Sequence, residues 1–198
     1  MTKKSDSTIK KIFIANVIIA VFFLAYSAFT HPIYIFDSII HLILTYIFWK
    51  HYKSWNQNVL VISMLSLVLL AHHMGIFGFY TSTLIAVPYD KFVHFMVGVV
   101  SSYSVLLFAK TRVNRSTAFS MVLIGVLGFS AFVEVIEFVG YSIARSGTFH
   151  GGFLDPGVLD KTGRVADLYF DTLTDIILGL LGAAFTLAVT SLRKFKTR

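Results

Sequence analysis

The chain has 198 residues, of which 56% are hydrophobic and only 14% are charged, and its formal net charge is +7. It contains no cysteine, which excludes the disulfide framework of a small secreted domain and any thiolate metal site. The apolar composition indicates a membrane protein. The basic residues are then explained by topology, so nucleic acid is not an expected partner.

Six apolar segments are candidates for crossing a hydrocarbon core about 30 Å thick, which takes about 20 residues each. They extend over residues 12–30, 33–49, 58–80, 92–109, 117–143 and 168–191. The sequence therefore predicts an all-α, polytopic transmembrane helix bundle of about six spans, with a single domain over residues 1–198. One connection is long, the polar and glycine-rich segment 144–167, which is expected to be a lid, a binding loop or a disordered excursion.

Lysine and arginine gather on one side of these spans. Basic residues precede the first span and follow the second, fourth and sixth, whereas the other side carries only Lys91, Arg145, Lys161 and Arg164. Because cytoplasmic loops are enriched in Lys and Arg, both termini are expected to be cytoplasmic and the segment 144–167 external. The expected location is a bacterial cytoplasmic (inner) membrane, crossed several times, with membrane lipids as partners.

Acidic residues interrupt the last two apolar segments. The sixth span carries Asp171 and Asp175, with Asp167 at its outer end, and spacings of four residues place these carboxylates on one helical face. Glu134 and Glu137, three residues apart in the fifth span, also share a face. Both sets fall in the half of the bilayer that faces away from the cytoplasm.

The other spans add imidazoles and further carboxylates at the same depth. These residues are Asp37 and His41 in span two, His72 and His73 in span three, and Asp90 and His94 at the start of span four. An ionised group at the centre of a membrane helix costs about 2.5–3.5 kcal/mol on insertion scales. The groups are therefore expected to face one another in one polar pocket that is open to the outside.

Two ways of stabilising such a pocket stay open. Crowded carboxylates without a nearby cation can share protons. Alternatively, oxygen and imidazole donors on facing helices can bind a divalent metal such as Zn, Mn, Fe or Mg. The expected metal ligands are His94, Glu134, Glu137, Asp171 and Asp175, and weaker candidates are His72, His73, Asp37, His41 and Asp167.

Small residues recur in the last two spans. Gly125, Gly128 and Ala131 in span five, and Gly179, Gly182 and Ala183 in span six, are expected to form smooth faces on which helix backbones approach closely.

Three motifs resemble a known family. They are Tyr89-Asp90-Lys91-x-x-His94-Phe95-x-x-Gly98, then Glu134-x-x-Glu137, then Asp171-x-x-x-Asp175 followed by Gly182-Ala183. This pattern resembles the YjdF-type bacterial inner-membrane proteins and is similar to the VanZ-like superfamily, over roughly residues 88–190. Glu137 stands where VanZ-like proteins usually have Gln, and Asp175 where they have Asn, so this pocket is more acidic. The resemblance implies a membrane bundle of about six helices and, for VanZ-like members, an association with glycopeptide resistance, but no reaction.

Three classes of function are compatible with this pattern. The first is a metal-dependent enzyme or binder of the cell envelope that acts on a lipid-linked or amphipathic substrate. Its catalytic residues would be Asp90, His94, Glu134, Glu137, Asp171 and Asp175. The second is a proton- or cation-coupled transporter, which the apolar cytoplasmic half of the spans disfavours. The third is a non-catalytic envelope or antibiotic-resistance factor.

Overall fold

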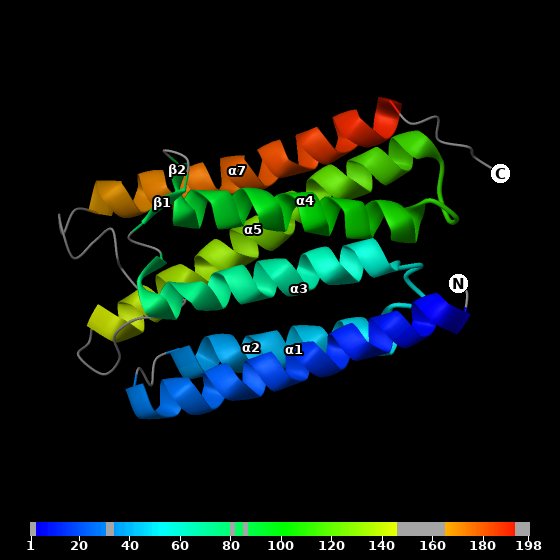
Figure 1. Cartoon of the computed structure of the whole chain (residues 1–198). Helices are drawn as coiled ribbons and strands as arrows, with labels where there is room; N and C mark the ends of the chain where they lie inside the picture. The colour runs from blue at the N-terminus through cyan, green and yellow to red at the C-terminus, as the bar shows by residue number, and fades with distance from the viewer. Residues whose placement is uncertain (1–2, 31–33, 80–81, 85–86, 146–164, 193–198) are drawn as a thin grey trace.

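The computed structural model describes residues 3–30, 34–79, 82–84, 87–145 and 165–192. Within these ranges the chain forms a helical bundle (Figure 1). Its α-helices are α1 (Lys3–Thr30), α2 (Ile35–His51), α3 (Val59–Met74), α4 (Tyr89–Ala109), α5 (Arg115–Arg145) and α7 (Val165–Leu192). The all-α, polytopic membrane fold expected from the sequence is confirmed.

Five stretches of helix are long and apolar enough to cross a membrane: Ser5–Thr30, Val59–Phe77, Tyr89–Ala109, Arg115–Val135 and Phe170–Ser191. The remaining helix, α2, has 17 residues and is about 25 Å long at about 1.5 Å per residue, which is shorter than a typical hydrocarbon core. It packs beside α1. Large apolar side chains such as Leu67 and Ile124 are exposed on the outside of the bundle, as lipid contact requires.

A short irregular segment joins α3 to α4. The helix α3 ends at Met74 and continues as the 3₁₀ turn η2 (Gly75–Phe77). Gly78 then adopts a φ of +81°, a left-handed conformation that favours glycine. An antiparallel pair of two-residue strands, β1 (Thr83–Leu84) and β2 (Val87–Pro88), leads directly into α4. The apolar helical stretch that corresponds to the predicted third span, residues 58–80, extends over Val59–Phe77.

The helices form two groups of three. Leu106 of α4, Val122 of α5 and Ala183 of α7 belong to one apolar core. Phe13 of α1 and Ile62 of α3 belong to another, with a residue that follows α2. The two groups meet along α3 and α4, as Figure 1 shows.

The two ends of the bundle differ in their polar contacts. Near the N-terminus, Asp6 accepts a hydrogen bond from the Tyr52 hydroxyl and lies 3.1 Å from the Lys53 ammonium and 3.4 Å from that of Lys10. The hydrogen bond to Asp6 and its negative charge raise the pKa of Lys53 above its ordinary value. The starts of α2, α4 and α7 and the ends of α3 and α5 lie at the opposite end from both termini (Figure 1).

Candidate functional site

The first turns of α4 supply three polar side chains to the candidate site. Pro88 fixes an extended backbone immediately before the helix, which then begins at Tyr89. Asp90 lies in the first turn, where the partial positive charge of the helix N-terminus favours a carboxylate. His94 follows one turn later, and its Nε2 atom lies 3.4 Å from Asp90 Oδ1. Residues 90 and 94 therefore act from one face of α4.

Lys91 is the centre of the site. Its Nζ atom donates hydrogen bonds to Asp171 Oδ1 at 2.5 Å and to both carboxylate oxygens of Asp175 at 2.8 Å. It also lies 3.1 Å from Asp90 Oδ2. The Asp175 side chain is only 2% exposed, so this ammonium compensates acids that are withdrawn from water.

The central role of Lys91 corrects the expectation that the carboxylates crowd together without a nearby cation. From the sequence, Lys91 was expected only as a basic residue between two spans and as a member of the motif Tyr89-Asp90-Lys91-x-x-His94, with no role in the site. Its place inside the acidic motif, directly after Asp90 and three residues before His94, was the signal that could have identified it.

The two acids of α7 reach Lys91 because α4 and α7 are in close contact. A Cβ atom added at Gly98 would collide with the backbone of Gly179, and one added at Gly182 would collide with the carbonyl oxygen of Phe95. The expectation that helix backbones approach closely at Gly179 and Gly182 is thus confirmed. It is wrong for Gly125 and Gly128, since an added Cβ there meets no described atom within 4 Å.

Glu134 brings α5 into the same site. Its Oε1 atom lies 3.9 Å from His94 Nδ1, and His94 Nε2 lies 3.8 Å from Asp175 Oδ2. The Glu134 side chain is buried, and Oε1 has no hydrogen-bond partner within the described residues. His94 therefore lies between carboxyl groups of three helices.

One subset of these residues has the compactness of a metal site. Asp90, His94 and Asp175 each offer a ligand atom, and these atoms all lie within 4.8 Å of one another. Asp90 was expected only among the catalytic residues, whereas Glu134 and Asp171 were expected as ligands. In the structure Asp171, like Asp175, accepts a hydrogen bond from Lys91.

The remaining predicted residues do not join this site. Glu137 lies on α5 and Asp167 on α7, but their side chains are outside the part of the chain that the structure describes. The four residues of α2 and α3 form a second group that is centred between those helices: Asp37, His41, His72 and His73. The polar side chains of the predicted pocket thus form two groups of contacts, one between α2 and α3 and one that joins α4, α5 and α7.

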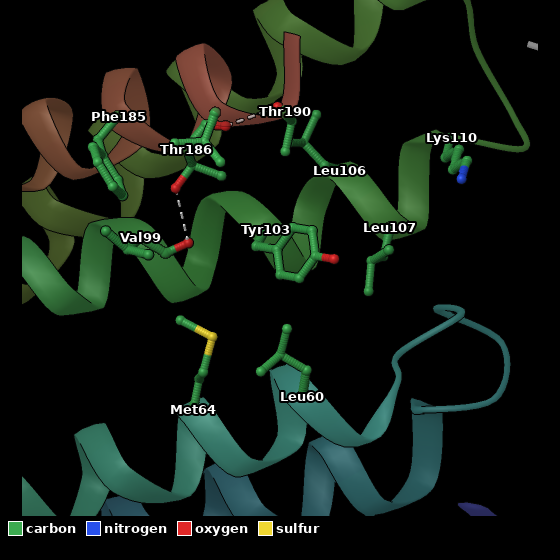
Figure 2. A pocket seen from close by; sticks show the side chains of 11 residues that line it. Leu60, Met64, Val99, Tyr103, Leu106, Leu107, Lys110, Phe185, Thr186 and Thr190 are labelled. Atoms are coloured by element: carbon green, nitrogen blue, oxygen red, sulfur yellow. Dashed lines mark hydrogen bonds between the residues drawn. The ribbon is translucent and has the colours of Figure 1, made fainter. Parts of the chain in front are cut away.

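A cavity of about 300 Å³ lies in the other half of the bundle, between α3, α4 and α7 (Figure 2). Its lining is mainly apolar and includes Leu60, Met64 and Leu106, while Thr186 and Thr190 bond to backbone carbonyls. Lys110 lies at its edge. No described carboxyl or imidazole group lines it.

A family model described as "Predicted membrane protein (DUF2238)" matches residues 9–196. The chain belongs to this family. No curated protein and no solved structure has significant similarity to the chain.

Proposed function

We propose that this member of the DUF2238 membrane protein family binds a divalent cation in the outer half of the bilayer, through Asp90, His94 and Asp175, and uses it to bind or transform a lipid-linked or amphipathic substrate. The proposal includes a location in a bacterial inner membrane and the kinship with YjdF-type and VanZ-like proteins that the motifs suggest. The observation that carries it is the compact group of three ligand atoms beside an excess of carboxyl groups.

The charge balance of the cluster supports cation binding. Among the described residues, the three carboxyl groups of Asp90, Asp171 and Asp175 lie within 3.1 Å of one ammonium group, that of Lys91. A fourth carboxyl group, that of Glu134, lies 3.9 Å from the neighbouring His94. Charged groups in a membrane are costly unless they are paired. One lysine does not balance all of this negative charge, and a divalent cation would compensate the remainder.

The donor set indicates which cations suit the site. Two carboxylates and one imidazole, supplied by facing helices, resemble the ligand combinations of helical-bundle metal sites. Such mixed oxygen and nitrogen donors suit Zn, Mn or Fe, whereas Mg prefers oxygen ligands and keeps several waters. We therefore expect Mn, Fe or Zn to bind more tightly than Mg.

Lys91 has a defined part in this proposal. In the absence of a divalent ion its ammonium holds both Asp171 and Asp175. When an ion binds Asp175, Lys91 keeps its hydrogen bond to Asp171 and can pair with an anionic oxygen of a substrate. The metal can polarise a phosphoryl or carbonyl oxygen and lower the pKa of a bound water. A head group of the outer leaflet would reach this depth laterally.

Metal content of the purified protein tests the proposal. Wild-type protein, equilibrated with Mn²⁺ and then dialysed, is expected to retain the ion, and Asp175→Asn is expected to lose it. Asp6→Asn is the matched control, because it removes a carboxylate at the other end of the bundle. Equal occupancy in wild type and Asp175→Asn would overturn the assignment.

A proton- or cation-coupled transporter is the second candidate. The observation in its favour is that Lys91 already neutralises part of the cluster, so the acids could exchange protons without a metal. The cavity in the opposite half, however, has no described carboxyl or imidazole group in its lining, and a relay across the membrane would need such groups. Ion uptake into vesicles that contain the purified protein distinguishes this candidate from a binder or enzyme.

A further inference from the structure

The cluster between α2 and α3 is built differently from the acidic site. Its titratable side chains are three imidazoles and one carboxylate: His41, His72, His73 and Asp37. Asp37, His41 and His73 are buried, and His72 is 19% exposed. A buried group of imidazoles is the donor set that borderline transition metals prefer, whereas the acidic site is rich in oxygen.

His41 lacks any hydrogen bond. It is 1% exposed, and neither ring nitrogen has a partner among the described residues. The neutral imidazole ring has one donor and one acceptor, and leaving buried polar atoms unpaired is energetically unfavourable. Thr45, one turn further along α2, likewise has a buried hydroxyl without a partner. A ligand at this position would satisfy groups that the protein leaves unpaired.

His73 is oriented as a metal ligand. Its Nδ1 atom lies 2.9 Å from the carbonyl oxygen of Leu69, and because a carbonyl can only accept, Nδ1 carries the proton. The lone pair of the neutral ring is therefore on Nε2. A hydrogen bond from the other ring nitrogen to a carbonyl is the usual way in which proteins fix a ligating histidine.

The Nε2 atom of His73 is only weakly engaged. It lies 3.3 Å from the Ser38 hydroxyl, which is also 3.3 Å from the carbonyl oxygen of Tyr34. One hydroxyl proton cannot serve both acceptors, so Nε2 remains open to a stronger ligand. The ring centroids of His41 and His73 are 4.9 Å apart, and His72 Nε2 lies 3.6 Å from Asp37 Oδ2 at the rim.

We propose that His41 and His73, with His72 and Asp37, form a second metal site that binds a borderline transition-metal cation such as Zn²⁺, Cu²⁺ or Ni²⁺. No three donor atoms of this cluster lie within 4.8 Å of one another, so binding needs a movement of side chains. Rotation of the His41 ring breaks no hydrogen bond that this ring makes within the described residues. This site does not depend on the cation site proposed above, since its donors come from α2 and α3 alone.

Cobalt spectroscopy tests this second site on the purified full-length protein. Co²⁺ bound by imidazoles has visible absorption bands that report its ligands and geometry. We expect the His41→Phe variant to lose these bands and to bind Co²⁺ or Zn²⁺ at least about tenfold more weakly than wild type. His51→Phe is the matched control, because it makes the same change on the same helix, at the cytoplasmic end.

Two further variants keep the test decisive. His72→Gln, at the more exposed rim, is expected to shift the Co²⁺ bands even if His41→Phe folds poorly. All of these spectra are recorded in the Asp175→Asn background, which removes Co²⁺ binding at the acidic site, so that the bands report the histidine site alone. Bands that are absent when all the histidines are in place, or that persist in both histidine variants, would overturn the proposal and leave a buried water as the partner of His41.

Discussion

Lys91 determines the electrostatics of the acidic site. Its ammonium hydrogen-bonds two acids of α7 and lies beside Asp90 of its own helix. A buried charge that loses its partner typically destabilises a protein by about 3–5 kcal/mol. Lys91 is therefore the stabilising cation of the metal-free protein and, for the same reason, the competitor of any metal that binds Asp175.

The residues of the site are expected to differ in their effect on metal binding. Asp175 belongs to the compact group that we propose binds the cation, so Asp175→Asn should abolish binding. Glu134 lies 3.9 Å from His94 Nδ1, and we propose that it hydrogen-bonds this ring when a cation is bound, so Glu134→Gln should weaken binding by about 10–100-fold. Titration of both variants with Mn²⁺ measures the difference. Identical losses would show that Glu134 is itself a ligand.

Side-chain chemistry indicated most of the acidic site but not its arrangement. The helical spacing of Asp90 with His94, and of Asp171 with Asp175, was enough to assign faces. The sequence could not tell which faces meet, because that depends on how helices pack. The sequence-based prediction therefore missed the pairing of Lys91 with Asp171, which are 80 residues apart in the chain. It also placed the histidines of α3 in the same group as the acids.

Close contact between α4 and α7 is the main feature at the scale of elements. Gly98, Gly179 and Gly182 allow the two backbones to approach, and this approach brings Asp171 and Asp175 to Lys91. The hydrophobic effect does not drive helices together within a membrane, so close packing at small residues provides much of the attraction between them. The geometry of the acidic site thus depends on glycines that carry no chemistry.

Two glycine substitutions should have opposite effects on stability. In Gly182→Ala the new methyl group meets the carbonyl oxygen of Phe95, so the helices must separate and the melting temperature should fall. In Gly128→Ala the added methyl group meets nothing within 4 Å, and the helix should gain about 0.5–1 kcal/mol. Thermal unfolding of both variants in detergent measures the contrast. Equal destabilisation would contradict the α4–α7 contact.

Hydropathy predicted the long helices well and their ends less well. The predicted start of the fourth span, residue 92, was three residues late, since Pro88 already sets the start of α4. The strands β1 and β2 were missed because two residues are too few for any alternating pattern. The expectation for Gly125 and Gly128 was wrong for another reason: sequence alone cannot distinguish a glycine that faces a neighbouring helix from one that faces outward.

Polarity is distributed asymmetrically over the whole molecule. Both polar clusters lie toward the end of the bundle opposite the two termini, while the other half has an apolar cavity (Figures 1 and 2). Most basic residues fall at the end with the termini. By the positive-inside rule, we expect that end to be cytoplasmic and both clusters to face outward.

Single cysteines test this orientation, since the chain has none of its own. Ser82, at the outer end before β1, and Ser54, between α2 and α3, are both exposed. An impermeant thiol reagent applied to intact cells should label Ser82→Cys, whereas Ser54→Cys should react only after lysis. The reverse pattern would place both polar clusters on the cytoplasmic side.

The most direct test of the cation-binding proposal compares the metal affinity of Lys91→Gln with that of wild type. Because the ammonium of Lys91 occupies the oxygens of Asp175, its removal should tighten binding of Mn²⁺ or Zn²⁺, and added metal should restore the stability that the variant loses. Calorimetric titration and thermal unfolding with and without the ion measure both effects. A variant that stays destabilised and binds no ion would contradict the proposal and leave the cluster as a structural ion-pair network.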